Sequence, residues 1–382
     1  MNKSTSLKIF LPVIFSFFVM GFVDLVGVAT GYVKQDFGLS DKVAQLIPFM
    51  VFIWFALMSI PTGVFQDRYG KRLTVNIGMV LTGVGLLIPF AYYSLTSALI
   101  GFALLGIGNT ILQVSANPLL IDISPEGSKA ANLSLSQLVK AVASMLGPIV
   151  TAGLALYLNN WKLVFPIFAA VSLLSAWWLA SVKIQESGLE KAPATFSGSF
   201  KLLKNPYILI AVLAIFFMVG FDVAMNTNIA SFLTAKFSVS LEAASLGIVI
   251  YFASLMTGRF LGAFLLRKVN IKLFMVVSTL LTLAGLLGIL FSDNLMTTRI
   301  LIFVAGLGFS NIFPIMFALI VAQKPAYANE LSGLIILAVS GGAVIPPIIG
   351  LLSDMLGFAS VIYVLIGCII YITYATYYVI KH

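Results

Sequence analysis

The sequence is poor in the residues on which most enzyme sites and soluble folds depend. Its 382 residues include one cysteine, Cys368, and one histidine, His382. A single cysteine excludes an intramolecular disulfide, and together with one histidine it offers no zinc-ligand pattern. Charged residues make up only 9% of the chain, whereas roughly a quarter is usual for a soluble domain. We therefore exclude a soluble fold and expect no metal site and no cofactor.

Apolar residues take the place of the missing polar ones. Hydrophobic residues account for 60% of the chain, and Phe and Gly each occur 31 times. A membrane-spanning helix needs about 20 mostly apolar residues. Twelve such stretches follow one another, the first over 9–33 and the last over 358–380. The pattern predicts an all-α polytopic membrane protein with twelve transmembrane helices, and the lipid bilayer is its expected partner.

The net charge of +9 would suggest a nucleic-acid partner in a soluble protein. Here the Lys and Arg residues cluster in short connections between apolar stretches, mostly on the side shared by both termini. By the positive-inside rule this distribution predicts that both termini are cytoplasmic. We expect an integral protein of a bacterial-type inner membrane, monomeric and without a nucleic-acid partner.

The two halves of the chain resemble each other at an offset of about 200 residues. Phe37 recurs as Phe237, and the Gly-Ile-Gly of 106–108 recurs as the Gly-Leu-Gly of 306–308. The repeat predicts two pseudo-symmetric six-helix bundles, an arrangement that places a substrate site between the halves of a transporter. The predicted parts are an N-terminal bundle over 1–182, a cytoplasmic linker over 183–205 and a C-terminal bundle over 206–382.

A charged, glycine-containing loop separates the second and third apolar stretches. It reads GVFQDRYGKR over 63–72. This loop resembles the cytoplasmic signature of the major facilitator superfamily, G-x-x-x-D-R-x-G-R/K-R, at the same place in the chain. The resemblance covers the whole chain and implies a transporter in which the loop helps to close the inner gate. The gating residues expected on this basis are Gly63, Asp67, Arg68, Gly70 and Arg72.

Two short segments resemble one branch of that superfamily, the fucose permease-like sugar:cation symporters. They are 116–118, which reads ANP, and 132–137, which reads NLSLSQ. The branch implies uptake of a neutral hexose or related sugar, driven by protons or by sodium. It uses a carboxylate in the first helix and a glutamate in the fourth. In this chain Asp24 stands about one turn before the first of these positions, Gln113 replaces the glutamate, and Lys140 occupies an asparagine position.

Two carboxylates lie inside long apolar stretches. Asp24 and Asp222 follow the similar segments FFVMGF and FFMVGF. An ionised aspartate at a helix centre costs about 2.5–3.5 kcal/mol, so each needs a hydrogen-bond partner, a proton or a bound cation. We expect Asp24, Asp222 and Asn226 to bind the coupling ion, either a proton or sodium; the alternative is that each aspartate is hydrogen-bonded within its own bundle. Asp122 and Asp354, at the ends of apolar stretches, are expected to be solvated.

Polar side chains inside the fourth, fifth and tenth stretches are candidates for substrate binding. Three of them recur at every fourth residue, which places them on one face of a helix. The predicted set is Asn109, Gln113, Asn117, Gln137, Lys140 and Asn311. Amide groups of this kind bind the hydroxyl groups of a sugar. Lys140 has three interpretations, which are binding an anionic substrate group, replacing a coupling cation, and extending its ammonium group to the interface.

The predicted function is secondary active transport, namely cation-coupled uptake of a sugar or sugar-derived small molecule by alternating access. An alternative is a carrier or exporter of an organic anion, such as a sugar acid, that Lys140 contacts. A membrane-embedded enzyme or sensor is a third alternative. The sequence disfavours an enzyme because it contains no nucleotide-binding loop and no catalytic cluster, and it disfavours a sensor because it contains no soluble output domain.

Overall fold

The computed structural model describes residues 3–124, 129–184, 186, 200–266, 269–324 and 327–381. These residues fold into helices, and none of them belongs to a strand. Twelve helical segments among them are long and apolar enough to cross a membrane, from Leu7–Phe37 to Ser360–Lys381. The predicted all-α polytopic membrane fold with twelve spans is confirmed.

The first six spans depart from regular helix at three places. The first span consists of three pieces, with a 3-10 turn in its middle, the second span is interrupted at Gln45 between α3 and α4, and a second 3-10 turn begins the sixth span. The elements are α1 (Lys3–Met20), η1 (Gly21–Asp24), α2 (Leu25–Phe37), α3 (Asp41–Ala44), α4 (Leu46–Tyr69), α5 (Lys71–Ala91), α6 (Leu95–Ile123), α7 (Lys129–Leu158), η3 (Trp161–Leu163) and α8 (Val164–Ala180).

The last six spans begin with the longest helix and contain breaks in the tenth and eleventh spans. The seventh span starts at Asn205, whose side chain accepts a hydrogen bond from the Tyr207 N–H, and Pro206 follows at the first helical position, where its fixed φ suits a helix start. The elements are α10 (Pro206–Phe237), α11 (Leu241–Leu265), α12 (Ile271–Phe291), α13 (Leu295–Phe309), α14 (Ile312–Gln323), α15 (Ala328–Ala338), α16 (Gly341–Leu356) and α17 (Ser360–Lys381).

The chain forms two compact units, and their membership does not follow the sequence halves. The first unit contains Met1–Val26 and Ile53–Pro193, and the second contains Gly27–Phe52 and Ala194–His382. The segment Gly27–Phe52 comes from the first half of the sequence but packs with the second half. The predicted boundaries at 182 and 206 rest on the repeat and remain a prediction, and most of the predicted linker lies outside the described residues.

Small residues let helices approach closely within the first unit. There α5 packs against α6 and α8, and α1 packs against α6, α7 and α8. A Cβ atom on Gly85 would lie 2.9 Å from the carbonyl oxygen of Gly101, and one on Gly101 would lie 2.7 Å from that of Gly85. Because neither position has space for a side chain, α5 and α6 make backbone contact, as is usual for membrane helices.

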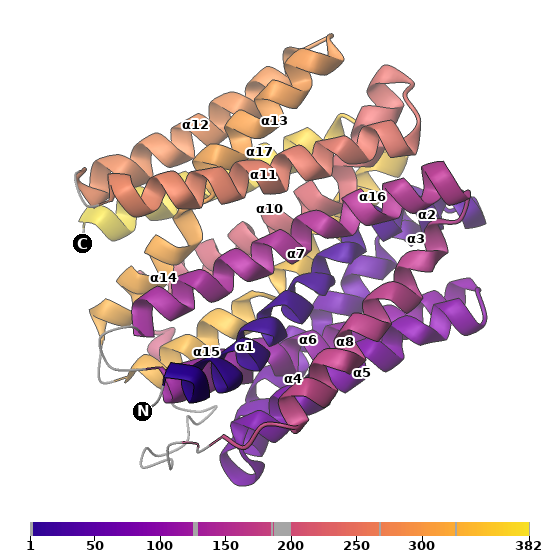
Figure 1. Ribbon diagram of the computed structural model, residues 1–382. Helices are drawn as coiled ribbons and strands as arrows, with labels where there is room; N and C mark the ends of the chain where they lie inside the picture. Colours follow the sequence, from indigo (N-terminus) through magenta and orange to yellow (C-terminus); the bar gives the residue numbers. More distant parts are fainter. Residues whose placement is uncertain are drawn as a thin grey trace. The chain divides into compact units, whose positions relative to one another are not determined.

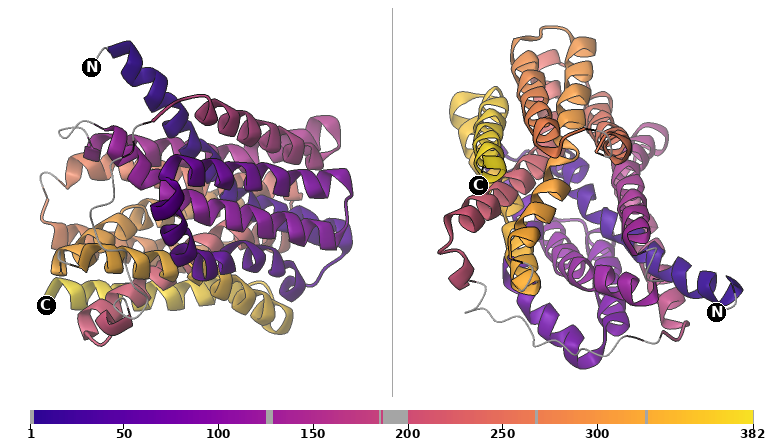
Figure 2. Two further views of the ribbon diagram at one scale, coloured as in Figure 1. Left: turned by 90° about the horizontal axis from the view of Figure 1, so that it is seen from below. Right: turned by 90° about the vertical axis from the view of Figure 1, so that its left-hand side faces the viewer.

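The second unit is arranged around α10. This helix contacts α11, α16 and α17, while α12 packs along α13 and α17. Figure 1 shows α12 and α13 side by side, and the orange pair in the right-hand view of Figure 2 is the same hairpin. The short α3, from the first half of the sequence, packs on α16, so the second unit contains helices from both halves.

Candidate substrate and coupling site

The break in the first span is held by polar contacts from two neighbouring helices. The side-chain amide of Asn109, on α6, donates a hydrogen bond of 2.7 Å to the carbonyl oxygen of Met20, where α1 ends. Gly21 faces α7, and a Cβ atom there would lie 2.6 Å from both the Lys140 carbonyl oxygen and the Ala143 Cβ. The break is thus an ordered feature, fixed by α6 on one side and by α7 on the other.

Asp24 ends this 3-10 turn and is only partly exposed. Its Oδ2 accepts a hydrogen bond of 2.5 Å from the hydroxyl of Ser144 on α7. Ser144 is 3% exposed, and its Oγ also lies 3.0 Å from the Lys140 carbonyl oxygen. Our sequence analysis missed Ser144, although its spacing of four residues from Lys140 places both on one face of α7.

The predicted row of amides on α6 exists, but its members differ in accessibility. Asn109 is fully buried. Its side-chain amide donates a hydrogen bond to the Met20 carbonyl oxygen, and its Oδ1 accepts one of 3.0 Å from the Gln113 side-chain amide. Its polar groups are therefore engaged within the protein. Gln113 and Asn117 are partly exposed, and Asn117 makes only a long contact of 3.4 Å to the Gln113 carbonyl oxygen. These two amides are better placed than Asn109 to meet a substrate.

The two predicted residues on α7 also differ from each other. Lys140 is partly exposed, and Gln137 is exposed. Gln137 and Lys140 are three residues apart, so they lie on neighbouring positions of one face. Contact of either residue with a substrate stays a prediction.

Asp222 lies in the middle of α10 and has a different kind of partner. The Tyr251 hydroxyl, from α11, donates a hydrogen bond of 2.6 Å to Asp222 Oδ1. Tyr251 is fully buried. Sequence reasoning missed this tyrosine, because one polar tip among many aromatic residues gives no periodic signal.

Asn226 lies one turn after Asp222 and is 2% exposed. It sits directly against Gly27 of α2, so any side chain at Gly27 would overlap the Asn226 amide. One half-turn further, Asn228 accepts a hydrogen bond of 2.8 Å from the buried side chain of Gln45. The C-terminal half of α10 therefore contacts the helical hairpin Gly27–Phe52, and one of these contacts is a hydrogen bond.

Asn311 links two helices of the second unit. It lies in the break between α13 and α14, is 7% exposed and donates a hydrogen bond of 2.6 Å to the Gly258 carbonyl oxygen on α11. Asn311 lies at a break and bonds to an unbroken helix, whereas Asn109 lies in an unbroken helix and bonds to the break in the first span. The predicted substrate contact of Asn311 stays a prediction.

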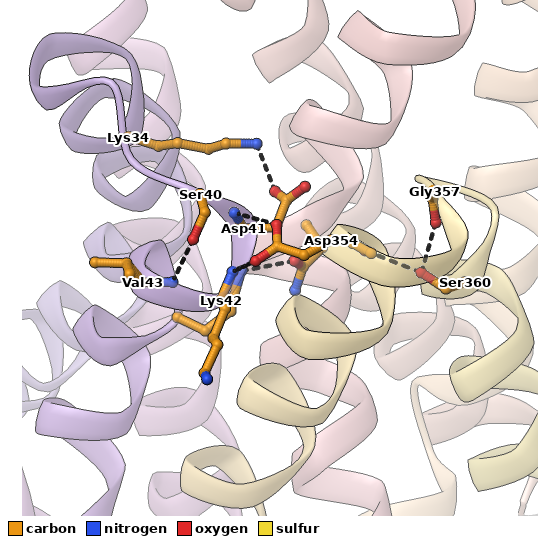
Figure 3. Close-up of polar contacts among 11 residues, drawn as sticks. Lys34, Ser40, Asp41, Lys42, Val43, Asp354, Gly357 and Ser360 are labelled. Carbon is orange, nitrogen blue, oxygen red and sulfur yellow. Dashed lines mark hydrogen bonds and ion pairs between the residues drawn. The ribbon is translucent and has the colours of Figure 1, made fainter.

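One end of the hairpin is attached to α16 by the carboxylate of Asp354, whose exposure agrees with the expectation that it is solvated. Asp354 accepts hydrogen bonds from the backbone N–H groups of Asp41 and Lys42, at 2.8 and 3.1 Å (Figure 3). Lys34 pairs with the Asp41 carboxylate at 2.5 Å, and the Ser40 hydroxyl accepts from the Val43 N–H. Asp354 is exposed, as expected, and it also accepts from the free N–H groups that the first turn of α3 presents.

The predicted signature loop is anchored through its backbone. Gly70 begins α5 with a φ of 94°, a conformation that favours glycine. The Glu186 carboxylate accepts hydrogen bonds from the backbone N–H groups of Lys71 and Arg72, at 2.5 and 3.0 Å. These contacts supply the acceptor that Gly70, without a side chain, does not provide.

Asp122, which was expected to be solvated, is buried near the signature loop. The Lys71 ammonium group pairs with Asp122 at 2.6 Å, and both side chains are only 8% exposed. Asp122 is therefore part of a buried pair, and the expectation that it is solvated was wrong. The Arg72 guanidinium donates to the Val182 carbonyl oxygen.

The remaining residues of the signature loop make few contacts. Arg68 is exposed and stacks on the Tyr69 ring at 5.2 Å. Around Gly63 there is open space for a side chain. The side chain of Asp67 lies outside the described part of the structure. The gating role of the loop stays a prediction.

Comparison with known proteins agrees with the motifs. A family model described as Major Facilitator Superfamily matches residues 13–347. The chain is 29% identical over 366 residues to a putative glucose/galactose transporter of Helicobacter pylori, covering 89% of this chain and 88% of that protein. It is 24% identical over 395 residues to a glucose/galactose transporter of Brucella abortus, covering 94% and 90%.

One solved structure similar to this chain is a variant of the Escherichia coli fucose:proton symporter FucP. The TM-score is 0.71 at 19% identity, and the match covers 97% of this chain and 98% of that one. At this identity the likeness concerns the fold. Together, these matches confirm the resemblance that the signature loop and the two short segments indicated.

Proposed function

Because the chain belongs to the Major Facilitator Superfamily, we propose that it is a cation-coupled importer of a hexose or related sugar. The relatives are named for glucose, galactose and fucose transport, which favours a neutral sugar as the substrate. The solved relative is named as a proton symporter, which favours the proton over sodium. As a transporter, the protein is expected to have no enzymatic activity.

The observation that carries this proposal is the polar cluster at the break of the first span. Asp24 ends the 3-10 turn with a hydroxyl donor beside it, and it is a carboxylate that can take up and release a cation. Gln113 and Asn117 offer partly exposed amides on the adjacent α6. An acidic residue on a turn that packs against a helix with accessible amides suits the coupling of ion binding to sugar binding.

Alternating access requires a gate that closes and opens on the outer side. We assign this role to the hairpin Gly27–Phe52, which packs within the second unit through Asn226, Asn228 and Asp354. Two of these contacts are hydrogen bonds between side chains or between a side chain and the backbone, and the third packs Asn226 against Gly27, so all of them can separate without unfolding a helix. Opening of the outer gate would then consist of the release of this hairpin from α10 and α16.

A second candidate function is transport of an organic anion such as a sugar acid. Lys140 favours it, because this partly exposed cation lies inside the fifth span, one turn from Ser144. A charged side chain in a span is costly and usually functional. An anionic carboxylate on the substrate would compensate its charge.

Proteoliposomes containing the purified chain distinguish these functions. Uptake of radiolabelled glucose, galactose and L-fucose would be measured with an imposed proton gradient and, separately, with a sodium gradient. We expect accumulation of at least one neutral sugar with the proton gradient. Accumulation of glucuronate or galacturonate alone would favour the anion carrier, and no accumulation of any of these solutes would refute the proposal.

We further propose that the protein is a monomer of a bacterial-type inner membrane with both termini on the cytoplasmic side. The bias of Lys and Arg residues toward the connections on that side supports the orientation. Reporter domains that are active on only one side of the membrane, fused to either end, would test it. Activity of a periplasmic reporter at either terminus would contradict the orientation.

A further inference from the structure

Ser144 has two hydrogen-bond acceptors on two different helices. Its Oγ lies 2.5 Å from Asp24 Oδ2, on η1, and 3.0 Å from the carbonyl oxygen of Lys140, on its own helix α7. A serine hydroxyl has a single proton and two lone pairs. It therefore donates to only one of these acceptors at a time, and it can accept a hydrogen bond while it donates.

We propose that Ser144 is the positioning residue that keeps Asp24 hydrogen-bonded in both its ionised and its protonated state. This proposal rests on the proposed function, in which Asp24 takes up the coupling proton. While Asp24 is ionised, the Ser144 hydroxyl donates to Oδ2. When a proton binds at Oδ2, the carboxyl group donates to Ser144 Oγ, and the hydroxyl proton rotates toward the Lys140 carbonyl oxygen.

The exchange needs no additional reactant and no movement of the backbone. The proton that reaches Asp24 comes from the aqueous pathway, and only the hydroxyl hydrogen of Ser144 changes direction. A buried donor or acceptor that loses its partner is costly. Since Ser144 is 3% exposed, a serine with one acceptor would incur that cost in one of the two states, whereas this serine does not.

The local structure holds the three participants in register. Gly21 brings η1 against α7, because a Cβ atom there would lie 2.6 Å from the Lys140 carbonyl oxygen. Asn109 fixes the other side of the turn through Met20. The carboxylate, the hydroxyl and the carbonyl oxygen therefore remain within hydrogen-bond distance while the proton is exchanged.

Five charged residues lie on the helices that pack against η1, and only one of them shares a helix face with Ser144. The elements packed against η1 are α1, α6 and α7. Their charged residues among those described are Lys3, Lys8, Asp122, Lys129 and Lys140. Lys140 shares a face of α7 with Ser144, whereas the others lie toward the ends of their helices. A change at Ser144 leaves all of these charges in place.

The test uses Ser144→Ala in proteoliposomes and separates driven accumulation from exchange. We expect proton-driven accumulation of the labelled neutral hexose to fall about tenfold, in line with a hydrogen bond to a charged group. Exchange of labelled for unlabelled hexose at saturating concentration needs no net proton transfer, so it should fall less than threefold. Ser144→Thr retains the hydroxyl and should restore accumulation.

The matched control is Ser175→Ala. Ser175, on α8, is also 3% exposed, but its hydroxyl donates only within its own helix, to the Val171 carbonyl oxygen. This variant should accumulate hexose like the wild type. Proton movement that accompanies hexose entry, measured with a pH-sensitive dye inside the vesicles, should persist in Ser175→Ala and be lost in Ser144→Ala.

Equal losses of accumulation and exchange in Ser144→Ala would overturn the proposal, because a merely structural role lowers both. Full accumulation in Ser144→Ala would overturn it as well. If the wild type itself accumulates none of the three hexoses, the proposed function fails, and this inference fails with it. If the wild type and Ser144→Ala accumulate hexose equally, only the role of Ser144 is refuted and the proposed function stands.

Discussion

The first and seventh spans contain similar sequence segments but place their aspartates in different surroundings. Asp24 ends a 3-10 turn between α1 and α2, whereas Asp222 lies inside the unbroken α10. Asp24 is paired with Ser144, a small hydroxyl that has a second acceptor beside it. Asp222 is paired with Tyr251, whose hydroxyl is held by a rigid, fully buried ring.

This difference favours different tasks for the two similar segments. A hydroxyl that rotates between two acceptors tolerates a change of protonation at its partner. A ring packed in the core holds its hydroxyl in one place and favours a constant hydrogen bond. We therefore propose proton exchange for Asp24, while the coupling role that the sequence predicted for Asp222 stays a prediction.

The largest expected effect is that of removing the Asp24 carboxylate in the first span. Asp24→Asn removes the carboxylate, so we expect proton-driven accumulation of hexose to fall about 100-fold, near the upper range of coupling energies. Exchange should be less affected. Asp293→Asn, at an exposed position between α12 and α13, is the control and should accumulate like the wild type. Normal accumulation by Asp24→Asn would remove this residue from proton coupling.

Removal of the Tyr251 hydroxyl tests the surroundings of Asp222 in the seventh span. Tyr251→Phe breaks the 2.6 Å hydrogen bond to Asp222, and we expect accumulation and exchange to fall together by about tenfold. Tyr371→Phe is a suitable control, since its hydroxyl makes only a long contact of 3.4 Å to the Ile210 carbonyl oxygen. Selective loss of accumulation in Tyr251→Phe would show that Asp222 also takes part in proton exchange.

The glycines that precede the two aspartates sharpen the contrast. A Cβ atom at Gly21 would meet the backbone of α7 at 2.6 Å, whereas one at Gly220 would meet chiefly the side chain of Ile345. Overpacking costs about 1–3 kcal/mol, and a backbone yields less than a side chain. We expect Gly21→Ala to lower uptake about fivefold and Gly220→Ala less, at that scale of overpacking.

The control for both glycine variants is Gly153→Ala, because a Cβ atom at Gly153 would enter open space. Uptake by each variant would be normalised to the amount of folded protein in the vesicles. A greater loss in Gly220→Ala than in Gly21→Ala would contradict the view that the break in the first span is the more constrained of the two sites.

The smallest expected effect concerns the outer end, where α2 and α10 belong to the same unit. Asp354→Ala removes two hydrogen bonds to the first turn of α3, so the hairpin should open more often. Ala44 is fully buried on α3, and a cysteine placed there would report opening. In a Cys368→Ser background, labelling of Ala44→Cys by an impermeant maleimide should accelerate about threefold.

Asp293→Ala serves as the control for this labelling experiment, because it removes an exposed carboxylate between α12 and α13. It should leave the labelling rate unchanged. An unchanged labelling rate in Asp354→Ala would mean that the contacts of Asn226 and Asn228 hold the hairpin closed without the carboxylate.

Sequence patterns predicted the fold and the spacing of amides along α6. The twelve apolar stretches predicted the twelve spans, and the signature loop predicted the superfamily. Spacing placed Gln113 and Asn117 on one face of α6, where the structure has them. The solvation of Asp122 was predicted wrongly, because its partner Lys71 is distant in sequence. The contact of the exposed Asp354 with the first turn of α3 was missed for the same reason.

The amino-acid sequence by itself determined the class of protein, since lipid imposes long apolar helices whose number and polarity can be counted along the chain. Tertiary structure alone decided which hydroxyl meets which carboxylate. Ser144 lies 120 residues from Asp24, and no periodic pattern links two single side chains on separate helices. Hydrogen bonds act over a few ångströms, so only the packing of α7 against the break in the first span brings this pair together.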